Sequence, residues 1–123
     1  MIVNERVVSY INSLDRGNSD ICNIIEKEAI EDQVPIIRKE MGNLLKVLLK
    51  LKQPKSILEV GTAVGYSSIL MSENMPVDCK IVTIENYDKR IPIARNNIKR
   101  AGKEDCIQLI EGDAMEVLKE LEG

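Results

Sequence analysis

The chain lacks several residue types on which common functions depend. Its 123 residues include no histidine, phenylalanine or tryptophan, and tyrosine occurs only at positions 10, 66 and 87. Without histidine, the chain cannot supply an imidazole base, a histidine metal ligand or a Ser-His-Asp triad. With so few aromatic residues, its core must be built from Ile, Leu, Val and Met.

Cysteine and long apolar runs are also scarce. Cys22, Cys79 and Cys106 are odd in number and lie far apart without a CxxC pair, so we expect reduced thiols and neither disulfides nor a zinc site. No apolar run is long enough to span a bilayer and no signal peptide is recognisable, which predicts a cytoplasmic protein with no membrane partner. The net charge of −3 gives no overall attraction to nucleic acid, although a local patch is not excluded.

The order of the apolar residues predicts helices first and a parallel sheet afterwards. Apolar residues make up 44% of the chain and charged residues 30%, which is typical of a single globular domain or part of one. Helical spacing predicts three helices. The first covers residues 3–16, the second begins at a cap provided by Ser19 or Asp20 and ends before Val34-Pro35, and the third runs from about residue 38 to 51. We expect residues 1–53 to form a helical region that caps a site or dimerises.

Beyond residue 54 the pattern alternates between strands and helices. We expect strands over 56–60, 80–85 and 106–111, and helices over 66–74, 88–101 and 114–121. Asp88 is expected to cap the second of these helices, and Asp113 with Glu116 the third. Right-handed crossovers then give an α/β fold with a parallel sheet in spatial order 3-2-1. Residues 54–123 are therefore expected to be the first half of a Rossmann-like domain, with the second half absent from this chain.

A glycine turn follows the first expected strand. Ile57, Leu58 and Val60 indicate a strand covered on both faces, and Gly61 and Gly65 then allow a tight turn and close approach of a ligand. Ser67 and Ser68 begin a helix there. Glu85 ends the second strand, where its carboxylate can accept from two ribose hydroxyls. These features predict a nucleoside-binding site at the carboxyl ends of the strands.

The turn does not match two common phosphate-binding patterns. A dinucleotide fingerprint would need glycine where Ala63 and Tyr66 stand, and no GK[ST] follows for a Walker A loop. A tight turn without a ligand, and half of a nicotinamide dehydrogenase, remain as alternatives. The acid at Glu85 fits a dehydrogenase, but the glycine spacing does not.

Three motifs follow the helix expected in VPIIRKEMGNLLKVLLKLKQPK. In sequence order they are ILEVGTAVGYSSI, IVTIE and IQLIEGDA. Together they resemble the cofactor half of class I S-adenosylmethionine-dependent methyltransferases. The closer resemblance is to the cation-dependent O-methyltransferases of the catechol and caffeoyl-CoA type, over residues 30–121.

This resemblance implies a set of cofactor-binding residues. Gly61, Thr62 and Ala63 would lie against the methionine part, with Gly65 in the same turn. Ser67 would bind its carboxylate, and Glu59 would face its amino group or brace the turn. Glu85 would bind the ribose. The residues bordering the adenine or covering the cofactor would be Asn86, Asp113, Ala114, Ile36 and Ile37.

The same resemblance places the metal ligands and the catalytic base beyond Gly123, so no catalytic or metal residue is assigned here. The intact protein would use Mg²⁺ or Mn²⁺ and methylate a small phenol or 5-hydroxyuridine in tRNA, whereas this chain alone is expected to be inactive. The alternative is a non-catalytic half-fold that binds a partner chain through the open first strand, either a second copy in a homo-oligomer or the missing half.

Overall fold

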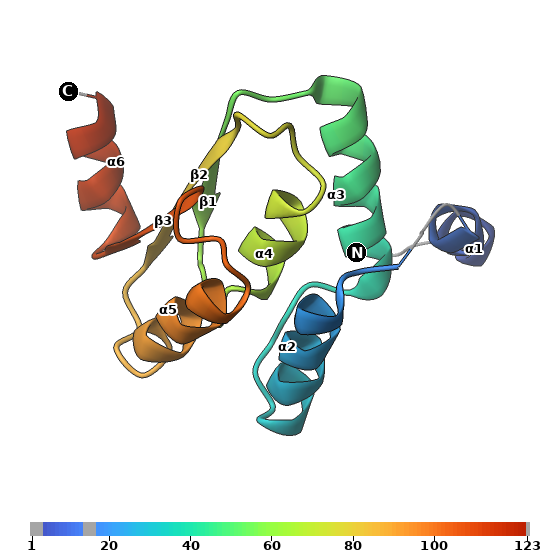
Figure 1. The fold of residues 1–123 in the computed structure, drawn as a ribbon, viewed down its shortest axis with the longest axis horizontal. Coiled ribbons are helices and arrows are strands. Elements are labelled where there is room, and N and C mark those ends of the chain that lie inside the picture. The colour runs from blue at the N-terminus through green and yellow to red at the C-terminus, as the bar shows by residue number, and fades with distance from the viewer. Residues whose placement is uncertain (1–3, 14–16, 123) are drawn as a thin grey trace.

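A computed structural model describes residues 4–13 and 17–122 and confirms the expected α/β order (Figure 1). The elements, in chain order, are α1 (Glu5–Ser13), α2 (Asp20–Glu31), α3 (Lys39–Lys52), β1 (Ser56–Val60), α4 (Tyr66–Ser72), β2 (Lys80–Glu85), α5 (Ile91–Arg100), β3 (Ile107–Glu111) and α6 (Ala114–Glu122). Residues 3 and 14–16 of the first expected helix lie outside the described part. The strands pair in parallel in the order β1-β2-β3, as predicted.

Two of the expected helix caps are present. Ser19 Oγ accepts a hydrogen bond of 3.2 Å from the backbone N–H of Cys22 at the start of α2. Asp113 Oδ1 accepts from the backbone N–H groups of Met115 and Glu116, at 2.9 and 3.3 Å, at the start of α6. Each bond satisfies an N–H that has no partner within its helix.

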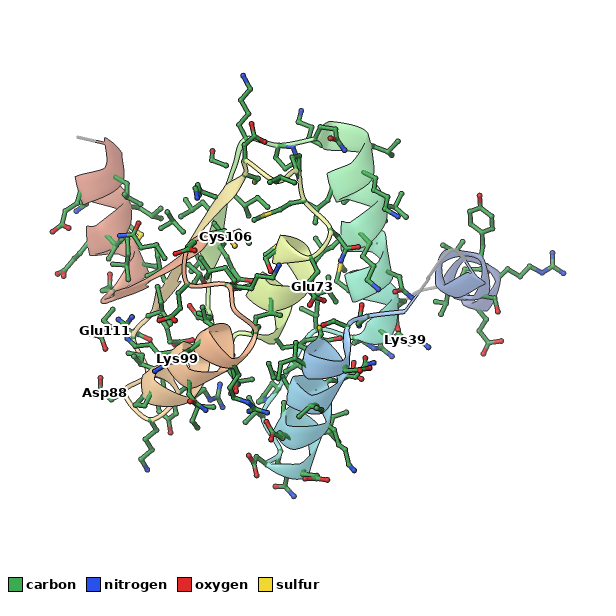
Figure 2. The ribbon with its side chains drawn as sticks, viewed as in Figure 1. Lys39, Glu73, Asp88, Lys99, Cys106 and Glu111 are labelled. Atoms are coloured by element: carbon green, nitrogen blue, oxygen red, sulfur yellow. The ribbon has the colours of Figure 1, made fainter. Side chains whose placement is uncertain are left out.

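The expected cap at Asp88 is wrong. Residues 88–90 form a turn, α5 begins at Ile91, and Asp88 is exposed at the outer edge of the molecule (Figure 2). A helix capped by Asp88 would need an N–H from position 92 to reach the carbonyl of Asp88, and Pro92 has none. Starting at Ile91 places Pro92 in the first turn, where no intrahelical N–H bond is required.

The sheet has helices on both faces but is covered unequally. α4 and α5 pack on one face, with α2 and α3 against α4, whereas α6 lies on the other face over β2 (Figure 1). The core between the sheet and α4 is aliphatic, as expected, and includes Ile69, Leu70 and Ile81, each at most 2% exposed. Tyr66 is the one aromatic residue in this core of the described chain.

β1 is not covered on both faces, which corrects the expectation for this strand. Ile57 and Glu59 point toward the core side, but the side chains of Leu58 and Val60 are 52% and 59% exposed. α6 lies over β2 and leaves this end of the sheet open. β1 is therefore an edge strand with an apolar, accessible face.

The free edge of β1 predicts self-association. At the two ends of the β1–β2 ladder, Lys80 N–H donates to Lys55 O and Gly61 N–H donates to Ile84 O. Odd-numbered residues of β1 therefore bond to β2, and even-numbered residues such as Leu58 direct their backbone N–H and C=O groups away from β2. We expect the 123-residue chain to form a dimer or larger species at micromolar concentration, because an unprotected apolar edge pairs readily.

Sedimentation equilibrium tests this prediction by measuring the molecular mass of the chain in solution. Leu58→Lys should shift the population toward monomer, since a lysine on an edge strand opposes pairing. A single 13.8 kDa species with cooperative unfolding in the unsubstituted chain would show that the edge does not drive association.

Candidate functional site

The expected site residues meet at the carboxyl edge of the sheet. Val60 is in register with Ile84, and Glu85 with Glu111, so the three strands end at nearly the same level. The glycine turn follows β1, Glu85 ends β2, and Gly112 with Asp113 follows β3. Parallel strands place these connections side by side, as the sequence predicts.

The glycine turn is bent sharply and is fixed to β2. Gly61, Ala63 and Gly65 have φ values of +93°, +50° and +86°, and the N–H groups of Gly61 and Thr62 donate to the carbonyl of Ile84 at 2.8 and 3.3 Å. A Cβ added to Gly61 would have no heavy atom within 4 Å. Gly61 therefore combines a left-handed backbone with open space above it.

Gly65 has a different surrounding. A Cβ at this position would lie 3.5 Å from the carbonyl oxygen of Ala94 and 3.7 Å from Cγ1 of Ile98, both in α5. Its small size brings the turn close to that helix, and Gly65 lines neither of the two hollows at this edge of the sheet.

Two hollows meet at Gly61. The first hollow, of about 250 Å³, lies between the turn and the segment before α3, and is lined by Pro35, Ile36, Ile37, Gly61, Thr62, Ala63, Val64, Tyr66 and Ser67. The second hollow, of about 220 Å³, is lined by Val60, Gly61, Ile84, Glu85, Asn86, Gly112, Asp113 and Ala114. All the expected binding residues except Glu59 and Gly65 line one or both.

Glu85 lines the second hollow, and its carboxylate is oriented by backbone donors. Oε1 accepts from the N–H of Ala63 at 2.7 Å, and Oε2 accepts from the N–H groups of Asn86 and Tyr87 at 3.1 Å each. The carboxylate thus ties the glycine turn to the end of β2. Its remaining acceptor capacity faces the second hollow, where hydroxyl donors of a ligand could reach it.

Glu59 lies beneath the turn, not in a hollow. Its carboxylate accepts from the hydroxyls of Ser67 and Ser68 and, at 2.7 Å, from Thr83 Oγ1, which is also 2.7 Å from Thr62 Oγ1. These bonds connect β1, β2 and the start of α4. Of the two roles expected for Glu59, bracing the turn agrees with these contacts.

The bond to Glu59 affects what Ser67 can offer a ligand. A serine hydroxyl has one hydrogen, and Ser67 donates it to Glu59. Its oxygen then presents acceptor lone pairs to the first hollow. To bind a carboxylate in the expected way, the Ser67 hydroxyl must rotate away from Glu59.

Sequence reasoning missed some contributors to this site. Thr83, which is fully buried, was not singled out, although a lone hydroxyl in an apolar strand needs a hydrogen-bond partner. Tyr66 is part of the core but also lines the first hollow. Pro35 also lines it, and its only signal was its position as a helix breaker.

Other features of the described residues bear on function. Among residues 4–13 and 17–122, no group of three or more Cys, Asp or Glu side chains could hold a metal ion. The three cysteines are free thiols, and burial raises the pKa of Cys22 to about 12. In that part of the chain no helix has the length and apolar character required to cross a membrane.

Comparison with known proteins shows one consistent family. The family model described as O-methyltransferase matches residues 18–123. The catechol O-methyltransferase of Niastella koreensis is 34% identical over 119 residues, which are 95% of this chain and 54% of that protein. A catechol O-methyltransferase of Mycobacterium tuberculosis is 31% identical over 87 residues, 71% of this chain and 40% of that protein.

Solved structures agree with the fold over nearly the whole chain. A Podospora anserina methyltransferase bound to S-adenosylhomocysteine has a TM-score of 0.85 at 28% identity, covering 100% of this chain and 57% of that one. The O-methyltransferase TomG from Streptomyces achromogenes, in complex with S-adenosylmethionine, has a TM-score of 0.79 at 30% identity, with the same coverage of 100% and 57%.

The chain thus spans about half the length of the relatives that it matches. Over that span the family model, the sequence identity and the Rossmann-like arrangement of helices and strands agree, and the chain belongs to the O-methyltransferase family.

Proposed function

We propose that this chain binds S-adenosylmethionine and S-adenosylhomocysteine, as the cofactor-binding part of an enzyme that methylates a hydroxyl group. The observation that carries the proposal is the open space above Gly61, where two hollows meet beside the carboxylate of Glu85. An elongated ligand with an amino acid at one end and a nucleoside at the other matches two hollows that share Gly61 as a lining residue.

The two hollows suit the two ends of the cofactor. The methionine part would occupy the first hollow, against Thr62, Ala63 and Ser67, with Ile37 on the opposite wall. The adenosine would occupy the second hollow, with its ribose on Glu85 and its adenine beside Asn86 and Ala114. Solved relatives in complex with S-adenosylhomocysteine or S-adenosylmethionine support binding of this ligand by the fold.

The residues around the turn would hold the cofactor in a fixed position. When bound, S-adenosylmethionine supplies an electrophilic methyl group. Glu59 and Thr83 keep the turn rigid from below, and Glu85 aligns it through Ala63 N–H. Such positioning lowers the entropic part of the barrier, which is a large contribution in group transfer.

The methyl acceptor that we propose is a hydroxyl of a small phenol. The support is the identity of 34% with a catechol O-methyltransferase. A hydroxyuridine in tRNA is the other acceptor considered, but Arg95 and Arg100 on α5 pair with Glu111 and Glu28, which reduces their availability for phosphate. The resemblance also implies a divalent cation, and among the described residues no group of three or more Cys, Asp or Glu side chains could hold one.

A second candidate function is a half-fold that binds a partner chain. The observation that favours it is the open edge of β1 with the exposed side chains of Leu58 and Val60. The two candidates share one residue, because Val60 also lines the second hollow, whereas Leu58 lines neither hollow. Residues 1–53 would then serve as the cap and a dimer surface, and residues 54–123 as the cofactor-binding half.

The isolated 123-residue chain is expected to bind cofactor without transferring a methyl group. It has no histidine, and its described residues provide no metal cluster to activate a hydroxyl. Incubation with labelled S-adenosylmethionine, Mg²⁺ or Mn²⁺, and either catechol or a hydroxyuridine RNA should yield no labelled product. A known catechol O-methyltransferase serves as the positive control, and a labelled product from this chain would contradict the expectation.

A further inference from the structure

Tyr66 connects the first hollow to a helix that does not line it. It is the first residue of α4, is 4% exposed and forms part of the wall of the hollow. Its hydroxyl donates a hydrogen bond of 2.8 Å to Glu26 Oε2 in α2. The phenol ring therefore spans from the glycine turn to the middle of α2.

α2 leads directly into the segment that closes the first hollow. The helix ends at Glu31, the chain reverses through Gln33 with φ of +58°, and Val34 N–H donates to Ala29 O at 2.9 Å. Pro35, Ile36 and Ile37, here called the roof, then line the hollow before α3 begins. Because the reversal is short and bonded back to Ala29, the position of the second half of α2, which includes Glu26, determines that of the roof.

α2 is also attached at places away from the hollow. Ser19 Oγ donates to Glu73 at the end of α4, a residue that Figure 2 shows between α4 and the start of α2. Arg100 forms an ion pair of 2.8 Å with Glu28. These contacts hold the helix as a whole, whereas the bond from Tyr66 attaches it to a wall of the hollow itself.

The hydroxyl of Tyr66 is suited to a constant structural bond. Burial, followed by its hydrogen bond to the Glu26 carboxylate, raises the pKa of Tyr66 above its ordinary value. The group therefore stays protonated and donating throughout the neutral range, and it has no role as a base there.

We infer that Tyr66 and Glu26 are a pair of positioning residues that hold the roof against the methionine part of the bound cofactor. The inference rests on the proposed function and adds to it a specific contribution to affinity: the pair acts on the amino-acid end of the ligand, and not on the adenosine end in the second hollow. Neither residue needs to contact the reacting atoms.

The test compares two ligands on one substitution. Tyr66→Phe should raise the Kd for S-adenosylhomocysteine by about 5- to 20-fold. This range corresponds to the loss of one hydrogen bond to a carboxylate, when only part of the free energy of that bond contributes to ligand binding. The Kd for adenosine, which lacks the amino-acid end, should remain within about twofold. Calorimetry or ligand-observed NMR measures both, and an equal loss for both ligands would show a general structural defect and overturn the inference.

Two further variants separate the pair from the helix. Glu26→Gln keeps an acceptor oxygen and should retain most of the affinity, whereas Glu26→Ala should match Tyr66→Phe, and the double variant should be no weaker than either single one. Ser19→Ala, which loosens the start of α2, is the matched control. It should lower Tm while leaving the Kd unchanged, and a loss equal to that of Tyr66→Phe would contradict the pairing.

Limited proteolysis without ligand tests the positioning of the roof separately from cofactor binding. Arg38 is exposed directly after the roof, so trypsin should cleave there several-fold faster in Tyr66→Phe than in the unsubstituted chain, with no such change in Ser19→Ala. If the unsubstituted chain binds no S-adenosylhomocysteine, the proposed function fails. If cleavage after Arg38 is the same in both chains, the positioning of the roof by Tyr66 fails.

Discussion

Replacing Glu85 with alanine is expected to weaken S-adenosylhomocysteine binding by roughly 1.5–3 kcal/mol, or about 10- to 150-fold in Kd, the range for a hydrogen bond to a charged group. The carboxylate borders the second hollow, where it can accept from ribose hydroxyls. It also accepts from the N–H of Ala63 at 2.7 Å. The substitution therefore removes a ligand contact and releases the glycine turn at the same time.

Glu111 provides the matched control for this substitution. It is in register with Glu85 at the end of the neighbouring strand, and Figure 2 shows it at the same side of the molecule as the start of α5. Its partner is Arg95, at 3.7 Å, and it lines neither hollow. Calorimetry should show unchanged affinity for Glu111→Ala, and unchanged affinity for Glu85→Ala would remove Glu85 from the site.

Replacing Gly61 with valine is expected to abolish cofactor binding while preserving most of the helix content. The new side chain would enter the open space where the two hollows meet. The φ of +93° adds strain, on the order of 1–3 kcal/mol for a non-glycine residue. Equilibrium dialysis with S-adenosylhomocysteine measures the binding, and circular dichroism measures the retained helix.

Gly102 separates the strain from the steric effect. It has a φ of +68°, and an added Cβ would likewise meet nothing within 4 Å, but it follows α5 and lines neither hollow. Gly102→Val should lower Tm to a similar degree and still bind the cofactor. Normal binding by Gly61→Val would place the ligand elsewhere.

The sequence allowed much of the fold to be predicted because its signals are local. The change from helical spacing to alternating strands and helices identified β1 and β2 with their observed bounds, and Ser19 and Asp113 were identifiable as caps. The prediction for the start of α5 was wrong because the sequence contains two start signals, a capping residue at Asp88 and a proline at position 92. The missing N–H of Pro92 decided between them.

The parts that could not be predicted depend on contacts between distant segments. An apolar run does not show whether both of its faces are covered, so the exposure of Leu58 and Val60 required the placement of α6. The bond from Tyr66 to Glu26 joins residues 40 positions apart, and no pattern in either segment indicates it. Likewise, the motif identified Glu59 and Ser67, but only the structure shows that they bond to each other.

Calorimetric titration of this chain with S-adenosylhomocysteine and, separately, with NAD tests the central claim most directly. The two ligands share an adenosine but differ in what is attached to it, so the comparison tests both hollows together. The account predicts saturable binding of S-adenosylhomocysteine at one site per chain, abolished by Gly61→Val, and no measurable binding of NAD. Binding of NAD with no binding of S-adenosylhomocysteine would contradict it.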